Sequence, residues 1–326
     1  MSGTLAMRDE MSGSYPTLVA TYGFLPNLFR LQSELPAAIE SQERLVHCIL
    51  VPENRLSRNS KDLLLCAVAS AWENEYCSAL FGRRLVAASD RDAALLKFSL
   101  KLAKHGPWFC QNDVDALRGA GFDDLAMIEA VSTTALGQMA CTLAEGLRPE
   151  VDQGAALHAP IKLPQLPESF EWVDASGPYL GSQTTLDTAF APYVVLREQL
   201  GFVPNLFRAL SLSPEVVEAV VQALERILFP EELLSRVQKE NILLVLSAAN
   251  LNTYWVTVHS QLLAALGVPL EDSDQVVEDH RQAAISTADI TLLDEVSKLA
   301  RSSAPREGKF DPAQLRAQGF TEPQIV

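Results

Sequence analysis

The chain has 326 residues, of which 48% are hydrophobic and 21% charged, a composition typical of a soluble globular protein of about two domains. Its 26 Lys and Arg residues against 41 Asp and Glu give a formal net charge of −15, which repels phosphate backbones and anionic headgroups and argues against nucleic-acid or membrane partners. No signal peptide or membrane-length apolar run is present, and five unevenly placed cysteines do not resemble a secreted disulfide framework. We therefore expect a cytoplasmic protein.

Helical periodicity runs along most of the chain. Leu and Ala recur at helical spacing over 60–72, 124–147 and 214–228, and together with sparse β-branched runs this predicts an all-α protein. Between 151 and 187 the periodicity stops and Pro and Gly become frequent, as in an inter-domain linker. We therefore predict helical domains over 15–150 and 188–326, called the first and second halves below.

One phrase occurs in both halves. "GFLPNLFR" at 23–30 returns as "GFVPNLFR" at 201–208, 178 residues later. The same spacing relates five further pairs of identical or similar residues, namely Ser57 and Ser235, Arg58 and Arg236, Asp62 and Glu240, Asn74 and Asn252, and Tyr76 and Tyr254. "LRGAGF" at 117 returns as "LRAQGF" at 315, so the second half has about twenty extra residues in between. We predict two tandem copies of one helical domain, related by an approximate two-fold axis.

The helix that begins near the shared serine carries an acid in each half. Ser57 and Ser235 are predicted N-caps, and Ser235 with Gln238 three residues later fits a capping box. Asp62 and Glu240 then fall in the first or second turn, where the helix dipole favours an acid. This structural role explains both acids without catalysis, so the chemistry depends on the helix that follows.

That next helix opens with "ENEYCSALF" at 73–81 in the first half and "NLNTYWVTVH" at 250–259 in the second. An acid on one helix, then C-x-x-C at the start of the next and a His one turn later, is the motif of the alkylhydroperoxidase D / carboxymuconolactone decarboxylase superfamily, which both halves resemble. The resemblance implies tandem helical domains forming a pseudo-dimer. In the redox members, the two cysteines are the peroxidatic and resolving thiols, and the acid and His form a proton relay.

In the first half, the resemblance places the acid at Asp62 and the second cysteine at Cys77, with Asn74 at the first cysteine position and Phe81 at the His position. A helix N-terminus lowers a thiol pKa, which makes Cys77 a candidate nucleophile, although a buried structural thiol is the alternative. Cys66 either approaches Cys77 from the preceding helix or belongs to the core. Asn74 suits a helix N-cap.

In the second half, the resemblance places the acid at Glu240 and the histidine at His259, while Asn252 and Trp255 occupy the cysteine positions. A His oriented by a carboxylate acts as general acid or base near neutral pH, so we expect Glu240 and His259 within hydrogen-bond reach or one water apart. The alternative is that the Glu240–His259 contact is a remnant without catalytic function and that the Trp255 indole fills the pocket. The aromatic residues beside these sites are candidate substrate-binding residues: Tyr76, Tyr254 and Trp255.

Three functions remain open. The first is a peroxidase-related oxidoreductase based on Cys77 and Asp62, for which the lost C-x-x-C predicts no efficient dithiol turnover. The second is a cysteine-independent acid/base enzyme of the decarboxylase or isomerase kind, using Glu240 and His259 on a small organic acid or lactone. The third is a non-catalytic assembly or binding protein.

No cofactor or metal is expected, because the other histidines lack ligand spacing. The single-domain relatives form larger rings, so the resemblance implies a homo-oligomer. At the spacing that relates Leu117 to Leu315, Val326 corresponds to Ile128. Most of the helix predicted over 124–147 therefore has no counterpart in the second half. We therefore expect either that the natural chain continues past Val326 or that another element fills the resulting groove.

Overall fold

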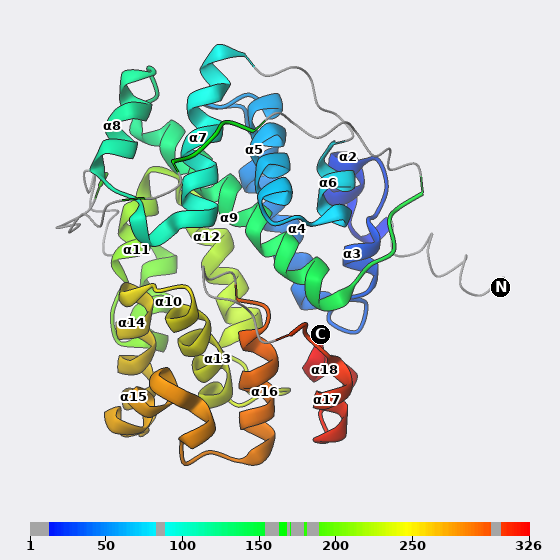
Figure 1. The fold of residues 1–326 in the computed structure, drawn as a ribbon, viewed down its shortest axis with the longest axis vertical. Coiled ribbons are helices and arrows are strands. Elements are labelled where there is room, and N and C mark those ends of the chain that lie inside the picture. The colour runs from blue at the N-terminus through cyan, green and yellow to red at the C-terminus, as the bar shows by residue number, and fades with distance from the viewer. Residues whose placement is uncertain are drawn as a thin grey trace.

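All regular secondary structure in the described part of the chain is helical, as predicted (Figure 1). The structure is a computed structural model, and it describes residues 13–82, 89–153, 163–167, 170, 179–180, 189–300 and 308–326. Most of the predicted linker, 151–187, lies outside these residues. No helix in the described ranges is long and apolar enough to cross a membrane.

The first half is built around one long central helix. Its helices are α2 (Pro16–Tyr22), α3 (Asn27–Arg30), α4 (Pro36–Leu50), α5 (Arg58–Ala71), α6 (Glu75–Gly82), α7 (Asp90–His105), the 3-10 turn η1 (Gly106–Trp108), α8 (Gln111–Gly119) and α9 (Asp124–Leu147). Helix α9 packs against α3, α4, α5, α6 and α7. Gly137 permits the close approach, because a Cβ at this position would lie 3.2 Å from Val68 Cβ. The α9 side chains therefore join the first-half helices into one core.

The second half repeats the early part of this order. Its helices are α10 (Ala191–Leu200), α11 (Asn205–Ala209), the 3-10 turn η2 (Leu210–Leu212), α12 (Pro214–Ala223), the π-helical turn η3 (Leu224–Leu228), α13 (Arg236–Ala249), α14 (Thr253–Ala265), α15 (Leu270–Asp279), the 3-10 turn η4 (His280–Gln282), α16 (Thr287–Ser297), α17 (Pro312–Ala317) and α18 (Glu322–Ile325). Helix α15 packs on α13 and α14. No helix in the described ranges joins α11, α12, α13 and α14 as α9 joins their first-half counterparts.

The two halves meet through α4 and α12, which begin 178 residues apart and pack against each other. Glu40 on α4 forms an ion pair with Arg226, and Glu218 on α12 forms one with Arg44 at 3.6 Å. Glu40 and Glu218 occupy corresponding positions at the 178-residue spacing. Each half thus contributes an acid at the same position to a contact with the other half.

Unusual backbone features also repeat at this spacing. Gly23 and Gly201 end their helices in the left-handed region, at φ 83° and 82°, a conformation that suits a residue without a Cβ. Glu73 and Leu251, just before α6 and α14, have φ values of 53° and 54°, although such values are uncommon for residues other than glycine. The break between the acid-bearing helix and the next one therefore has the same backbone geometry in both halves.

Candidate active site

The acid-bearing helices begin as the sequence predicts. Ser57 accepts a hydrogen bond from Ser60 N at the start of α5, and Ser235 forms the predicted reciprocal capping box with Gln238 at the start of α13. The first residue of each helix is an arginine, Arg58 or Arg236. Because residues four apart lie on one face of a helix, each arginine is placed beside its acid.

In the second half, Glu240 sits between a guanidinium and an imidazole. Arg236 donates to Glu240 Oε1 from Nε at 2.7 Å, and its Nη2 lies 2.6 Å from the same oxygen. His259 Nδ1 lies 2.7 Å from Glu240 Oε2. Glu240 is fully buried, and the side chains of Arg236 and His259 are 9% and 8% exposed. The predicted contact between Glu240 and His259 is therefore confirmed.

This arrangement fixes the orientation of the His259 ring. A carboxylate oxygen accepts from an N–H, so this contact suits a ring with its proton on Nδ1, and in the neutral form of that tautomer Nε2 carries the lone pair. Within the described ranges, the side-chain hydrogen bond of the His259 ring is the one to Glu240, and the side chain as a whole is 8% exposed.

Aromatic rings surround the second-half site. The Trp255 indole stacks on the His259 ring, with centroids 5.3 Å apart and planes 20° from parallel, and Tyr254 packs edge-on against Trp255 at 5.2 Å. The Arg236 guanidinium carbon lies over the Phe229 ring, 4.8 Å from its centroid. Trp255 is partly exposed and Tyr254 is 39% exposed. These two rings are therefore the partly exposed neighbours of the buried imidazole.

In the first half, the corresponding place holds an ion pair without a histidine. Arg58 Nε donates to Asp62 Oδ1 at 2.8 Å, and Phe81 is buried at the position corresponding to His259. Arg58 also lines an open cavity of about 520 Å³ with Thr21, His47 and other residues of α2, α4 and the following loop. The Arg58 side chain is 23% exposed, so this ion pair is closer to water than the Arg236–Glu240 pair.

Cys77 does not have the environment of a reactive thiol. It is fully buried, and burial, followed by hydrogen bonding to Cys141, raises its pKa well above the ordinary value. The expectation that the helix N-terminus lowers this pKa is therefore wrong, because desolvation opposes the thiolate more strongly. Burial also raises the pKa of Cys66, with a further contribution from Asp62. Asn74 caps α6 by accepting from Cys77 N at 2.9 Å, as predicted.

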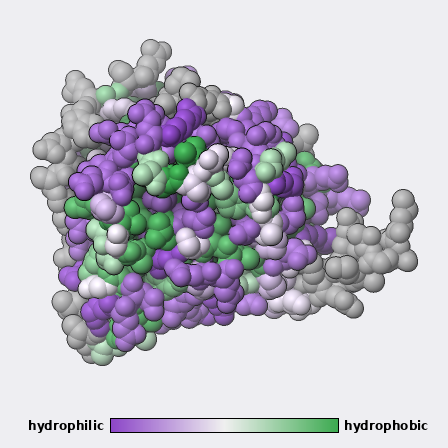
Figure 2. All heavy atoms as spheres, turned by 90° about the horizontal axis from the view of Figure 1, so that it is seen from below, coloured by the Kyte–Doolittle hydropathy of each residue, from purple (hydrophilic) through white to green (hydrophobic). Residues whose placement is uncertain are grey.

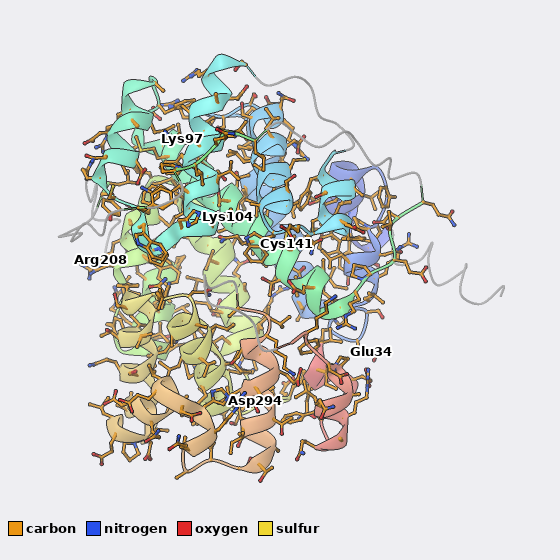
Figure 3. The ribbon with its side chains drawn as sticks, viewed as in Figure 1. Glu34, Lys97, Lys104, Cys141, Arg208 and Asp294 are labelled. Carbon is orange, nitrogen blue, oxygen red and sulfur yellow. The ribbon has the colours of Figure 1, made fainter. Side chains whose placement is uncertain are left out.

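The neighbour of Cys77 is a cysteine that sequence reasoning did not identify. Cys141 lies in the C-terminal half of α9 (Figure 3), and both cysteines are fully buried. Asn74 Nδ2 donates to the Cys141 carbonyl oxygen at 3.3 Å. No local spacing marks this pair, because the two residues meet only through the packing of α9 on α6.

The two predicted substrate-binding tyrosines differ in their surroundings. Tyr76 is 7% exposed; its hydroxyl donates to Asp152 Oδ2 at 2.8 Å and accepts from Leu28 N at 3.0 Å. Burial, and then the Asp152 charge, raise the pKa of Tyr76. Tyr254 makes the corresponding contact with Leu206 N at 3.3 Å but is much more exposed. Tyr76 thus has a structural role, whereas Tyr254 lies at the surface beside Trp255.

The described residues contain no group of three or more His, Cys, Asp or Glu side chains that could hold a metal ion. A second cavity, of about 260 Å³, lies where the halves meet and is lined by Lys61, Glu129, Glu215 and others. Neither this cavity nor the one beside Arg58 is lined by Glu240 or His259. The second-half site therefore lies outside both cavities.

Comparison with known proteins found no match to a family model, a curated protein or a solved structure. The functional argument for this chain therefore rests on its own residues. They form an all-helical protein with a buried Arg–Glu–His triad in the second half and an Arg–Asp pair with two buried cysteines in the first.

Proposed function

We propose that the second half carries a cysteine-independent general acid/base site, with His259 Nε2 as the group that exchanges a proton with substrate. The observation that carries this proposal is the 2.7 Å contact between His259 Nδ1 and Glu240. In this proposal Nδ1 donates to Glu240, and Nε2 of the neutral ring carries the lone pair that accepts the proton. A His–carboxylate pair of this kind is a recurring arrangement in proton-transfer catalysis.

Arg236 has a positioning role in this proposal. Its guanidinium pairs with Oε1 of the buried Glu240 carboxylate, and Oε2 remains for the imidazole. When Nε2 accepts a proton, the resulting imidazolium lies directly beside the negative charge of Glu240, which stabilises it in a poorly solvated place. Arg236 and Glu240 therefore support proton transfer without contacting the substrate.

The substrate class follows from what this triad supplies. A single base can remove a proton from a carbon next to a carbonyl group. The C–H electron pair then forms a C=C bond, the carbonyl π pair moves to the oxygen, and the protonated base can return the proton to another carbon. It can also protonate the carbanion left when a carboxylate departs as carbon dioxide. The exposed faces of Trp255 and Tyr254 suit a small, planar, largely apolar body. We therefore assign a small organic acid or lactone, undergoing isomerisation or decarboxylation.

We infer further that the halves are tandem copies of one domain and pack as a pseudo-dimer. The repeated capping serines, the repeated left-handed residues before α6 and α14, and the α4–α12 contact support this inference. The resemblance to the alkylhydroperoxidase D / carboxymuconolactone decarboxylase superfamily depends on the acid, cysteine and histidine positions of the motif, of which the second half keeps the acid and the histidine and the first half keeps the acid and one cysteine. Assembly of the whole chain into a homo-oligomer belongs to the same proposal.

The thiol alternative is favoured by one observation, the contact between Cys77 and Cys141. A peroxide-oxidised Cys77 has a resolving thiol within reach, which would form a disulfide and release water. Both thiols are fully buried, however, and the pKa of Cys77 is raised, so the attacking thiolate is scarce. The acid/base site is therefore the better-supported candidate, and a purely structural role for the triad is the outcome if neither chemistry is found.

The test is exchange of carbon-bound hydrogen for deuterium in a panel of small lactones and carboxylic acids, followed by NMR in D₂O. The wild-type protein is compared with His259→Phe, which introduces the residue that naturally occupies the corresponding position, Phe81. Loss of a general base predicts a fall in exchange rate of about 10²-fold or more. The control Cys77→Ser should leave the rate unchanged. Exchange that survives in His259→Phe, or no exchange with any compound, would refute the proposal.

A further inference from the structure

The open cavity beside Arg58 brings a guanidinium to the surface of the first half. Its volume is about 520 Å³, a size typical of small-molecule sites. Arg58 Nε donates to Asp62 Oδ1 at 2.8 Å, and within the described ranges this is the hydrogen bond that the Arg58 side chain makes. Its two Nη groups therefore have no acceptor in this part of the chain. Arg58 lines the cavity with 23% of its side chain exposed, so these groups are the donors left for a ligand.

The rest of the lining combines polar groups with an apolar wall. The Thr21 hydroxyl and the His47 ring both belong to the lining, and neither makes a hydrogen bond to another described residue. The apolar part of the lining consists of Pro16, Ala20, Leu50 and Val51. An apolar wall with a few polar groups is the usual composition of a ligand site.

The second half shows why the Arg58 guanidinium is accessible. At the 178-residue spacing, Val51 corresponds to Phe229 and Arg58 to Arg236. The Arg236 guanidinium carbon lies over the Phe229 ring, and the Arg236 side chain is 9% exposed. Val51 is a smaller residue and is itself 48% exposed. We attribute the greater exposure of Arg58 to this smaller side chain.

We propose that the cavity beside Arg58 binds a small monocarboxylic acid, with its carboxylate on the guanidinium and its apolar body against the aliphatic wall. The Nη groups only donate hydrogen bonds, so the ligand atoms beside them must be acceptors. A guanidinium matches the geometry of a carboxylate, and the hydrogen bonds between them are charge-assisted. The site lies in the first half, and the inference does not depend on the chemistry proposed for His259.

The acids around Arg58 restrict the charge of the ligand. Asp62 already pairs with its guanidinium, and Glu53, which also lines the cavity, accepts from Arg58 N at 3.2 Å. Glu231 makes the corresponding contact with Arg236 N at 3.0 Å, so this acid has a structural role at the helix start in both halves. A dianion would meet both carboxylates beside a single guanidinium. The cavity therefore favours a monocarboxylate over inorganic phosphate.

The probe is hexanoate, titrated into the full-length protein and followed by isothermal titration calorimetry. Val51→Phe introduces the residue that naturally occupies the corresponding position, Phe229. It should abolish saturable binding, because the ring fills the cavity without changing the charge. The matched control is Val151→Phe, since Val151 is 50% exposed but does not line the cavity, and its affinity for hexanoate should equal that of the wild type.

A second variant tests the guanidinium itself. Arg58→Lys keeps a positive charge beside Asp62 but loses the planar fork of donors. We expect it to bind hexanoate at least about tenfold more weakly, because hydrogen bonds to a charged group are lost. Thermal unfolding curves verify that the variants remain folded, and Arg58→Lys provides the test if Val51→Phe does not fold.

Adsorption of the alkyl chain on another surface is the competing result. The end of the molecule seen from below, which Figure 1 shows to be formed by the second half, has apolar side chains across its middle with hydrophilic ones around them (Figure 2). Hexanamide has the same alkyl chain without the charge. It should bind at least about tenfold more weakly than hexanoate if the guanidinium holds the carboxylate, and equally well if the chain only adsorbs.

Several results would overturn the proposal. They are the absence of saturable hexanoate binding up to about 10 mM, an equal affinity for hexanamide or for inorganic phosphate, and equal weakening by Val51→Phe and Val151→Phe. The deuterium exchange proposed for His259 is a separate readout, which Val51→Phe should leave unchanged. Failure of the binding site and failure of the acid/base site are therefore distinguishable.

Discussion

Glu240→Gln removes the one negative charge that faces both Arg236 and His259. Glutamine can still accept a hydrogen bond from Arg236, but the guanidinium, 9% exposed, loses its charged partner. Removing one partner of a buried ion pair costs about 3–5 kcal/mol, because the other charge stays buried without compensation. We therefore expect the free energy of unfolding to fall by about 3–5 kcal/mol, measured by urea denaturation with circular dichroism.

The first half supplies the matched control, Asp62→Asn. Arg58 is 23% exposed and lines an open cavity, so water can solvate the unpaired guanidinium and the loss should be about 1–2 kcal/mol. A double variant, Glu240→Gln with Arg236→Met, should recover part of the stability, since no unpaired charge then remains. A loss of less than about 1 kcal/mol in Glu240→Gln, or a loss no larger than in Asp62→Asn, would refute the role assigned to burial.

Three other outcomes are expected. Gly137→Ala should lower the melting temperature because a Cβ there meets Val68 Cβ at 3.2 Å, whereas Gly146→Ala, with its nearest neighbour at 3.8 Å, should leave it unchanged or raise it; equal effects of the two would contradict the close approach of α9. Burial raises the pKa of Cys66 and of Tyr76, so their contribution to stability is complete below the unfolded-state pKa values of about 8.5 and 10 and is lost as the pH rises above them. The urea midpoint should therefore be lower at pH 10.5 than at pH 8, and equal midpoints would contradict the raised pKa values. With peroxide and a dihydrolipoyl-type reductant, the protein should show at most one stoichiometric oxidation, and sustained turnover that disappears in Cys77→Ser would show that the buried thiol is active.

Local sequence patterns predicted the helical class and the caps of α5 and α13, because periodicity and capping chemistry act between residues close together in sequence. The contact between Glu240 and His259 was expected from the family resemblance, which places the acid and the histidine on two consecutive helices. Arg236 was recognised as a repeated residue, and its spacing of four from Glu240 was the available signal for the third member of the triad. The site could therefore have been derived almost completely from helical spacing.

The burial of individual side chains and their long-range contacts were harder to predict from the sequence. For Cys77 the sequence left open a thiol activated by the helix N-terminus and a buried structural thiol, and desolvation by the surrounding core decides for the second. Its contact with Cys141 arises where α9 packs on α6, and no spacing in the sequence encodes that contact. Tyr76 and Tyr254 also looked equivalent in sequence, yet α9 and Asp152 enclose only the first of them.

The tautomer and solvent contact of His259 test the central claim most directly. Nitrogen-15 NMR of the labelled protein, compared with His259→Phe to assign the signal, reports which ring nitrogen carries the proton in the neutral form. The account predicts a protonated Nδ1 and an unprotonated Nε2 whose signal shifts when an exchanging lactone or carboxylic acid is added. A proton on Nε2 in the neutral form, or an Nε2 signal that no such compound perturbs, would contradict the assignment of His259 as the base.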